Sequence, residues 1–213
     1  MNILKNLKFK FQQLSVRDVT KILKKLKKSR SSGLDDISSE AIRPVIDEIA
    51  PALTSVINSS LREGIFPSEY KCAKVICVFK GKGAREDPGC YRPISNLALF
   101  GKCQEVAVDM QLRKFCEKYN LFGSHQHGFR KARSTTTALL TAITRWRSER
   151  SKKFRGVLFF DLSAAYDTLS MELFAEKAKI FGIEGSELAW FRSYLSDHSQ
   201  VVQVNQAIRS LRW

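Results

Sequence analysis

Asp161 directly follows a short apolar run, GVLFF at positions 156–160, and this junction constrains the fold more than any other part of the sequence. An uninterrupted apolar run of this length is typical of a strand that is buried on both faces. A carboxylate at the end of such a strand is costly unless it is paired, protonated or bound to a cation. We therefore expect Asp161 to lie at a cation-binding edge of a sheet or, alternatively, to cap or turn the chain just beyond the strand.

Hydrophobic periodicity predicts a mixed α/β (α+β) chain. Helices are expected from a Ser15 cap to about Lys28, over 39–61 with Pro51 opening a second helix or kinking the first, over 97–120, from about Ser134, over 170–181 and over 187–195. A hairpin is expected to join the apolar run AKVICVF to CYRPISN across a loop rich in glycine and charge. The alternating segment VVQVN is expected to form an edge or hairpin strand.

The chain carries 36 basic and 21 acidic residues, which gives a formal net charge of +15. Such an excess is the electrostatic footprint of a nucleic-acid-binding protein, with an anionic membrane surface or a merely basic soluble domain as the alternatives. Ten basic residues and one acid fall within the first 30 positions. Apolar residues at helical spacing there also predict an amphipathic helix with a solvated face.

Other classes of site receive little support. Five cysteines without a C-x-x-C pair argue against a disulfide framework and a zinc ribbon, so packing thiols are expected. A metal role for Cys116, His125 and His127 would lack a fourth ligand at a usual spacing. No apolar run approaches the roughly 20 residues of a membrane span, and lysines interrupt any signal-peptide core. An intracellular protein, nuclear or cytoplasmic, is expected, with a mitochondrial transit peptide as the alternative.

The string FFDLSAAYDTL at positions 159–169 resembles the first palm motif of reverse transcriptases, the RNA-directed DNA polymerases. The resemblance implies that Asp161 is catalytic and binds two Mg²⁺ ions, one of them with help from the backbone carbonyl of Leu162. It also implies that Tyr166 lies beneath the nucleotide sugar and rejects ribose, and that Ala164 and Ala165 let the backbone approach the triphosphate. Without the resemblance, Tyr166 would be interpreted as a core aromatic.

The string KCAKVICVFKGKGAREDPGCYRPISN at positions 71–96 resembles the fingers hairpin of the enzymes of non-LTR (LINE-type) retrotransposons. This implies that Lys80 and Arg92 contact the triphosphate of the incoming nucleotide. Lys82 is expected to assist or replace Lys80, because Phe79 stands where the family usually has proline. Taken alone, the segment would be a solvent-exposed hairpin tip.

The string HQHGFRKARSTTTAL at positions 125–139 resembles a family segment that lies near template and primer. The resemblance implies nucleic-acid contacts for Gln126, Gly128, Phe129 and Arg130, with Phe129 stacking on a base and Arg130 meeting a phosphate. The alternative is a helix-entry loop that is capped by Ser134.

Together with SSGLDDISSEAI and WFRSYLSDHSQVVQVN, these strings extend the resemblance over about residues 28–210. It implies a right-hand polymerase fold, incomplete in this chain. The expected divisions are a basic N-terminal helix and linker over 1–34, a fingers region over 35–153, and the beginning of the palm over 154–213.

The predicted function is that of an N-terminal fragment of a reverse transcriptase domain. The implied partners are an RNA template, a DNA primer and dNTP, without a membrane, and no pattern predicts an oligomeric state. Because the string of motifs stops before a later pair of metal-binding aspartates, the chain alone is expected to be inactive, and primer extension on an RNA template would contradict this. The alternatives are a non-catalytic basic RNA- or DNA-binding remnant and a domesticated relative such as a group II intron maturase.

Overall fold

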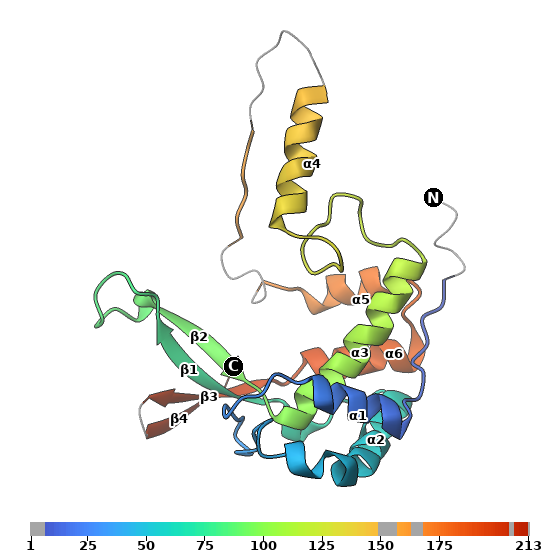
Figure 1. Cartoon of the computed structure of the whole chain (residues 1–213), viewed down its shortest axis with the longest axis vertical. Helices are drawn as coiled ribbons and strands as arrows, with labels where there is room; N and C mark the ends of the chain where they lie inside the picture. Colours follow the sequence, from blue (N-terminus) through green and yellow to red (C-terminus); the bar gives the residue numbers. More distant parts are fainter. Residues whose placement is uncertain (1–6, 149–156, 163–167, 205–206, 213) are drawn as a thin grey trace. The chain divides into compact units, whose positions relative to one another are not determined.

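The computed structural model describes residues 7–148, 157–162, 168–204 and 207–212 (Figure 1). The chain contains both helices and strands, as the sequence predicts. The helices are α1 (Val16–Lys25), α2 (Ile46–Glu63), α3 (Leu99–Lys118), α4 (Thr135–Ser148), α5 (Met171–Ile180) and α6 (Gly185–Leu195), with short 3-10 turns at Arg43–Val45, Ser68–Tyr70 and Pro88–Cys90. The strands are β1 (Cys72–Phe79), β2 (Tyr91–Asn96), β3 (Ser199–Val204) and β4 (Ala207–Arg212).

The chain divides into two compact units, and each is described by itself. The large unit comprises Met1–Arg113 and Met171–Trp213, and the small unit comprises Lys114–Ser170. The predicted division into N-terminal helix, fingers and palm at positions 34/35 and 153/154 stays a prediction. Among the described helices, none combines the length and the hydropathy that a membrane span requires.

Helix α1 begins where the sequence predicts it. The Ser15 side chain accepts a hydrogen bond from the Asp18 backbone N–H, and the Asp18 carboxylate accepts one from the Ser15 backbone N–H. This capping box satisfies two of the N–H groups that the start of a helix leaves without partners. The buried stripe that α1 packs against α2 is formed by Val19, Ile22 and Leu23.

Helix α2 begins later than the periodicity predicts. The apolar spacing predicts a helix from Ser39, but a 3-10 turn precedes α2, which starts at Ile46. Pro44 explains the delay, because proline lacks an N–H and disfavours helical backbone at the preceding residue. Pro51 lies inside α2 and does not open a second helix. The helix ends at Gly64, whose φ of 71° is the left-handed conformation that glycine adopts readily.

The four strands of the large unit form one sheet in the order β2-β1-β3-β4. Strands β1 and β2 form the predicted antiparallel hairpin, in which Val78 lies opposite Arg92. Strand β1 also pairs in parallel with β3. The described part of VVQVN, residues 201–204, therefore belongs to an inner strand, and its antiparallel pairing with β4 confirms the hairpin alternative rather than the edge alternative. Ala73 and Val75 of β1 are buried in the core.

The predicted buried strand ahead of Asp161 is wrong for the residues that the structure describes. Val157–Phe160 have no strand conformation, and Phe159 and Phe160 are each 88% exposed. A strand needs neighbouring strands to pair its backbone groups, and no described residue pairs with this run. Asp161 is exposed as well. The free-energy cost of burying a carboxylate, from which a cation site was predicted, therefore does not arise at this position.

A buried polar cluster joins three helices of the large unit. The Ser60 hydroxyl oxygen of α2 accepts hydrogen bonds from the Trp190 indole N–H of α6, at 3.0 Å, and from the Gln104 side-chain amide of α3. The same hydroxyl donates to the Ile65 carbonyl. Trp190 is 1% exposed and Gln104 is fully buried. Loss of the Ser60 hydroxyl would therefore leave two buried donors without an acceptor.

Residues Leu7–Leu14, which we call the strap, contact the segment that follows α5 and helix α6. The Phe9 N–H donates to the Gly182 carbonyl at 2.8 Å, and the Phe11 N–H donates to Glu187 at 3.2 Å. Lys10 forms an ion pair of 2.9 Å with the same carboxylate. Burial acts to raise the pKa of Glu187, but these hydrogen bonds hold it below its ordinary value.

Candidate nucleotide and nucleic-acid interface

Aromatic and backbone contacts between its own residues stabilise the tip of the β1–β2 hairpin. The rings of Phe79 and Tyr91 lie 5.4 Å apart, and the Arg85 guanidinium lies 5.6 Å from the centre of the Phe79 ring. The Tyr91 hydroxyl donates to the Arg85 carbonyl at 2.9 Å, and the Lys80 N–H donates to the Cys90 carbonyl at 2.8 Å. These contacts hold the tip that carries the predicted basic residues. Arg85 was not predicted as a functional residue. Its place in the loop of the predicted hairpin, six positions after Phe79, is the signal in the sequence that could have identified it.

The predicted nucleotide contacts differ in how they are held. The Lys80 ammonium donates to the Gly89 carbonyl at 2.6 Å, across the hairpin. Lys82 and Arg92 are exposed, and no ion pair within the described ranges involves either of them. Arg92 offers a planar fork of donors and Lys82 a point charge, which are the two common ways of binding phosphate.

Arg92 shares its face of the sheet with exposed apolar side chains. The register pairs Val78 with Arg92 and Ile76 with Ile94, so these four side chains point to one side. Ile76, Val78 and Ile94 are 38%, 49% and 45% exposed. A cation above an apolar floor suits a ligand with both a phosphate and a flat hydrophobic group, which is the composition of a nucleotide.

The second predicted group lies in the small unit, in the loop between α3 and α4. Phe129 is 79% exposed. The Gln126 side-chain amide donates to the Gly128 carbonyl at 3.2 Å. Arg130 is paired with Glu117 at 2.9 Å. The predicted cap at Ser134 is present as well, because its hydroxyl accepts the Thr137 N–H at 3.2 Å.

The third predicted group surrounds Asp161, which is exposed together with Leu162. Ala164, Ala165 and Tyr166 lie outside the described residues. Asp161 belongs to the small unit and the hairpin residues belong to the large unit. The assembly of these groups into one site stays a prediction.

The described residues do not by themselves fit a magnesium site. Among them, no group of three or more His, Cys, Asp or Glu side chains could hold a metal ion. Asp161 with the Leu162 carbonyl offers one carboxylate and one backbone oxygen, whereas two neighbouring ions need several anionic oxygens. The His127 Nδ1 lies 2.9 Å from the Thr137 hydroxyl.

Burial shifts the pKa values of several groups in the core of the large unit. Burial raises the pKa of the Cys103 thiol to about 12, as expected for a packing thiol. Burial also raises the pKa of Glu105, and it raises that of Tyr194, whose hydroxyl donates to Glu105 at 2.8 Å. These groups stabilise the packing of α3 against α6 and do not mark a catalytic centre.

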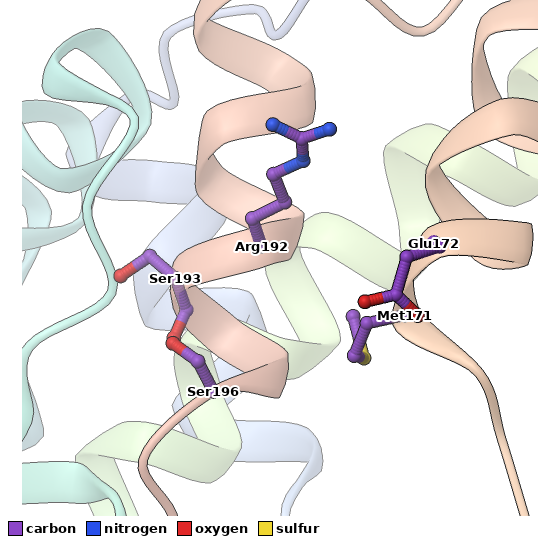
Figure 2. Close-up of a pocket in the computed structure, with 5 residues that line it drawn as sticks. All are labelled: Met171, Glu172, Arg192, Ser193 and Ser196. Carbon is purple, nitrogen blue, oxygen red and sulfur yellow. The ribbon is translucent and has the colours of Figure 1, made fainter.

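A cavity of about 320 Å³ lies between α5 and α6. Figure 2 shows the residues that line it. Within the described part of the chain, the cavity is lined by Met171, Glu172, Arg192, Ser193 and Ser196. The Ser193 hydroxyl already accepts the Phe66 N–H at 3.0 Å. None of the residues that the sequence predicts as contacts lines this cavity.

Comparison with known proteins gives a consistent result. The family described as "Reverse transcriptase (RNA-dependent DNA polymerase)" matches residues 80–213, which is more than half of the chain. The chain is 25% identical over 202 residues to "Probable RNA-directed DNA polymerase from transposon BS" of Drosophila melanogaster, with 91% of the chain and 21% of the relative covered.

Two further relatives come from other mobile elements. The chain is 27% identical over 191 residues to "Putative 115 kDa protein in type-1 retrotransposable element R1DM" of Drosophila melanogaster, covering 89% of the chain and 18% of that protein. It is 27% identical over 155 residues to "RNA-directed DNA polymerase from mobile element jockey" of Drosophila funebris, covering 72% of the chain and 17% of that protein. The chain thus spans about a fifth of the length of these curated relatives.

Proposed function

The chain belongs to the reverse transcriptase family, in the kind found in non-LTR retrotransposons, and from that premise we propose that it forms the fingers and the beginning of the palm of an RNA-directed DNA polymerase. In this proposal the partners are an RNA template, a DNA primer and a dNTP. The mixed helix and strand composition is compatible with the right-hand fold that the proposal includes.

The observation that carries the proposal is the β1–β2 hairpin with its exposed cations. Lys82 and Arg92 would bind the β- and γ-phosphates of the nucleotide, because charge-assisted hydrogen bonds to phosphate oxygens are strong and specific in direction. Lys80 would stabilise the hairpin through the Gly89 carbonyl and add its charge to the field at the tip. The exposed Ile76 and Ile94 would lie beneath the flat part of the ligand.

Asp161 and the Leu162 carbonyl are proposed to contribute to Mg²⁺ binding, and Tyr166, with Ala164 and Ala165, to the pocket around the sugar and triphosphate. Magnesium would stabilise the charge that builds on the phosphate oxygens during nucleotidyl transfer. Within this motif the described residues supply one carboxylate, that of Asp161, which is fewer than two Mg²⁺ ions need. Polymerisation by these residues alone is not expected.

The nucleotide proposal is tested with the double variant Lys82→Ala/Arg92→Ala in the full chain. The affinity for a fluorescent dNTP, measured in the presence of template and primer, should fall by about tenfold or more, because two charge-assisted contacts are lost. The control is Lys21→Ala/Lys25→Ala on the exposed face of α1, which removes the same charge. An equal loss in the control would show that the hairpin is not the contact.

A second candidate function is non-catalytic binding of RNA or DNA, and one observation favours it. Asp161 lies in an exposed segment without strand conformation, and among the described residues it belongs to no group of side chains that could hold a metal ion. Primer extension on an RNA template separates the two candidates. Incorporation of nucleotides that depends on Asp161 would favour the enzyme, whereas template binding without incorporation would favour the binding module.

A further inference from the structure

Arg130 is enclosed by groups of its own unit. Its Nε and Nη2 donate to the two carboxylate oxygens of Glu117 at 3.2 and 2.9 Å, and its Nη1 donates to the Gly123 carbonyl at 3.3 Å. The guanidinium carbon lies 5.0 Å from the centre of the Phe122 ring. This two-pronged ion pair ties the end of α3 to the following loop, and the Arg130 side chain is only 11% exposed.

These contacts fix a loop whose backbone is unfavourable on its own. Phe129 and Ala132 both have a φ of 59°, a region in which a residue with a side chain is uncommon. Such conformations persist where the surrounding structure over-determines them. Arg130 lies between the two strained positions, so its ion pair is well placed to hold them.

The loop presents other residues to solvent. Lys131 and Arg133 are exposed on either side of Ala132, and Phe129 is 79% exposed. No ion pair between described residues involves Lys131 or Arg133. The Arg133 N–H donates to the Arg130 carbonyl at 3.4 Å, so the turn anchored by Arg130 also places Arg133. An aromatic ring beside two cations suits single-stranded nucleic acid, whose bases stack while its phosphates pair with charge.

We propose that Arg130 is a positioning residue and that Phe129, Lys131 and Arg133 make the nucleic-acid contact of this loop. The inference rests on the proposed function and deepens it. It replaces the sequence-based expectation that Arg130 itself meets phosphate, because Glu117 already neutralises that guanidinium. In the loop, Phe129 stacks on an unpaired base while Lys131 and Arg133 bind the neighbouring phosphates.

The first test exchanges the charges of the ion pair in the full chain. Binding to a fluorescent single-stranded RNA oligonucleotide is measured by anisotropy at low salt. Arg130→Glu sets two acids against each other and should weaken binding by about tenfold or more. Adding Glu117→Arg restores the pair in reverse and should recover most of the affinity. If Arg130 itself contacted phosphate, the double variant would stay as weak as the single variant.

A second variant separates positioning from general attraction. Glu117→Gln removes a negative charge, so a purely electrostatic loop, or an Arg130 released toward phosphate, would bind RNA more tightly. Positioning predicts weaker binding, because the loop loses its anchor. Arg130→Lys keeps the charge but loses the fork, and it should also weaken binding. Melting curves show which variants remain folded, and tighter binding by a folded Glu117→Gln chain would overturn the proposal.

The third test concerns the contacting residues themselves. Lys131→Ala/Arg133→Ala should lower the slope of log affinity against log salt by about 1.4, because each single-strand phosphate contact contributes about 0.7. The control, Lys114→Ala/Arg147→Ala, removes the same charge from exposed positions of α3 and α4 and should change the slope less. Phe129→Ala should weaken binding roughly tenfold by loss of stacking. Equal slopes in the two double variants would overturn the assignment.

The outcomes distinguish this inference from the function on which it rests. A wild-type chain that does not bind RNA at low salt overturns both. A wild-type chain that binds, combined with no recovery in the charge exchange, overturns the role of Arg130 alone.

Discussion

Two apolar runs of similar composition have different fates in this chain. AKVICVF becomes β1, an inner strand with β2 on one side and β3 on the other. The run ahead of Asp161 has no strand conformation at Val157–Phe160, and these four residues are exposed. An apolar run therefore forms a strand only where neighbouring strands are available, because a single run cannot pair its own backbone groups. Within the described residues, only the first run has such neighbours.

The contrast between packed and exposed segments predicts very different losses of stability when a buried and an exposed aromatic side chain are removed. Trp190→Ala should destabilise the fold by about 3–5 kcal/mol, because it empties a buried site and removes one hydrogen bond to Ser60. Phe160→Ala should change stability by less than about 0.5 kcal/mol, because its ring is exposed. Urea unfolding followed by circular dichroism measures both. A comparable loss in Phe160→Ala would mean that the segment ahead of Asp161 is packed.

The contact between the strap and Gly182 can be tested with a matched pair of glycine substitutions, whose expected effect on stability is smaller. Gly182 and Gly81 have φ values of 77° and 78°, so alanine strains the backbone equally at both. At Gly182 an added Cβ would also lie 2.1 Å from the Leu7 carbonyl oxygen, whereas at Gly81 nothing lies within 4 Å. We expect Gly182→Ala to cost about 2–4 kcal/mol and Gly81→Ala about 1–2 kcal/mol. Equal losses in thermal unfolding would show that the strap does not depend on this close approach.

Substitution of Glu187 is expected to have the smallest of these effects on stability, and the effect should depend on pH. Its hydrogen bonds to the strap hold its pKa below the ordinary value of 4.5, so the folded state gains stability above that pH. Glu187→Gln should cost about 1–2 kcal/mol at neutral pH. As the pH falls through the lowered pKa, the wild-type carboxylate becomes protonated and its advantage disappears. Melting temperatures between about pH 7 and pH 3 test this, with the exposed Glu176→Gln as the control. A difference that stays constant over this range would contradict the assignment.

Local features of the fold could be predicted from the sequence, and distant pairings could not. The helix cap at Ser15 and the β1–β2 hairpin depend on residues close in sequence, and both are confirmed. The strap connects residues more than 170 positions apart, as in the pair Lys10–Glu187. The alternation of LKFKF at positions 7–11 was its only local signal, since period-two spacing is typical of an extended segment.

The candidate site shows the same limit. The basic residues of the hairpin were visible in the sequence, because charge and glycine at a hairpin tip are local. The partnership of Arg130 with Glu117 spans 13 positions and depends on how the loop turns back to α3, so residue types alone could not predict it. Which cations are already paired is a property of the fold, not of composition.

Hydrogen–deuterium exchange of the chain, alone and with an RNA template annealed to a DNA primer, tests the central claim most directly. In the chain alone, the amides of 73–79 should exchange slowly and those of 157–162 rapidly, because only the first group is paired in a sheet. On addition of template and primer, protection should increase at 80–92 and at 126–133. Slow exchange at 157–162 in the chain alone, or protection confined to α1, would contradict the account.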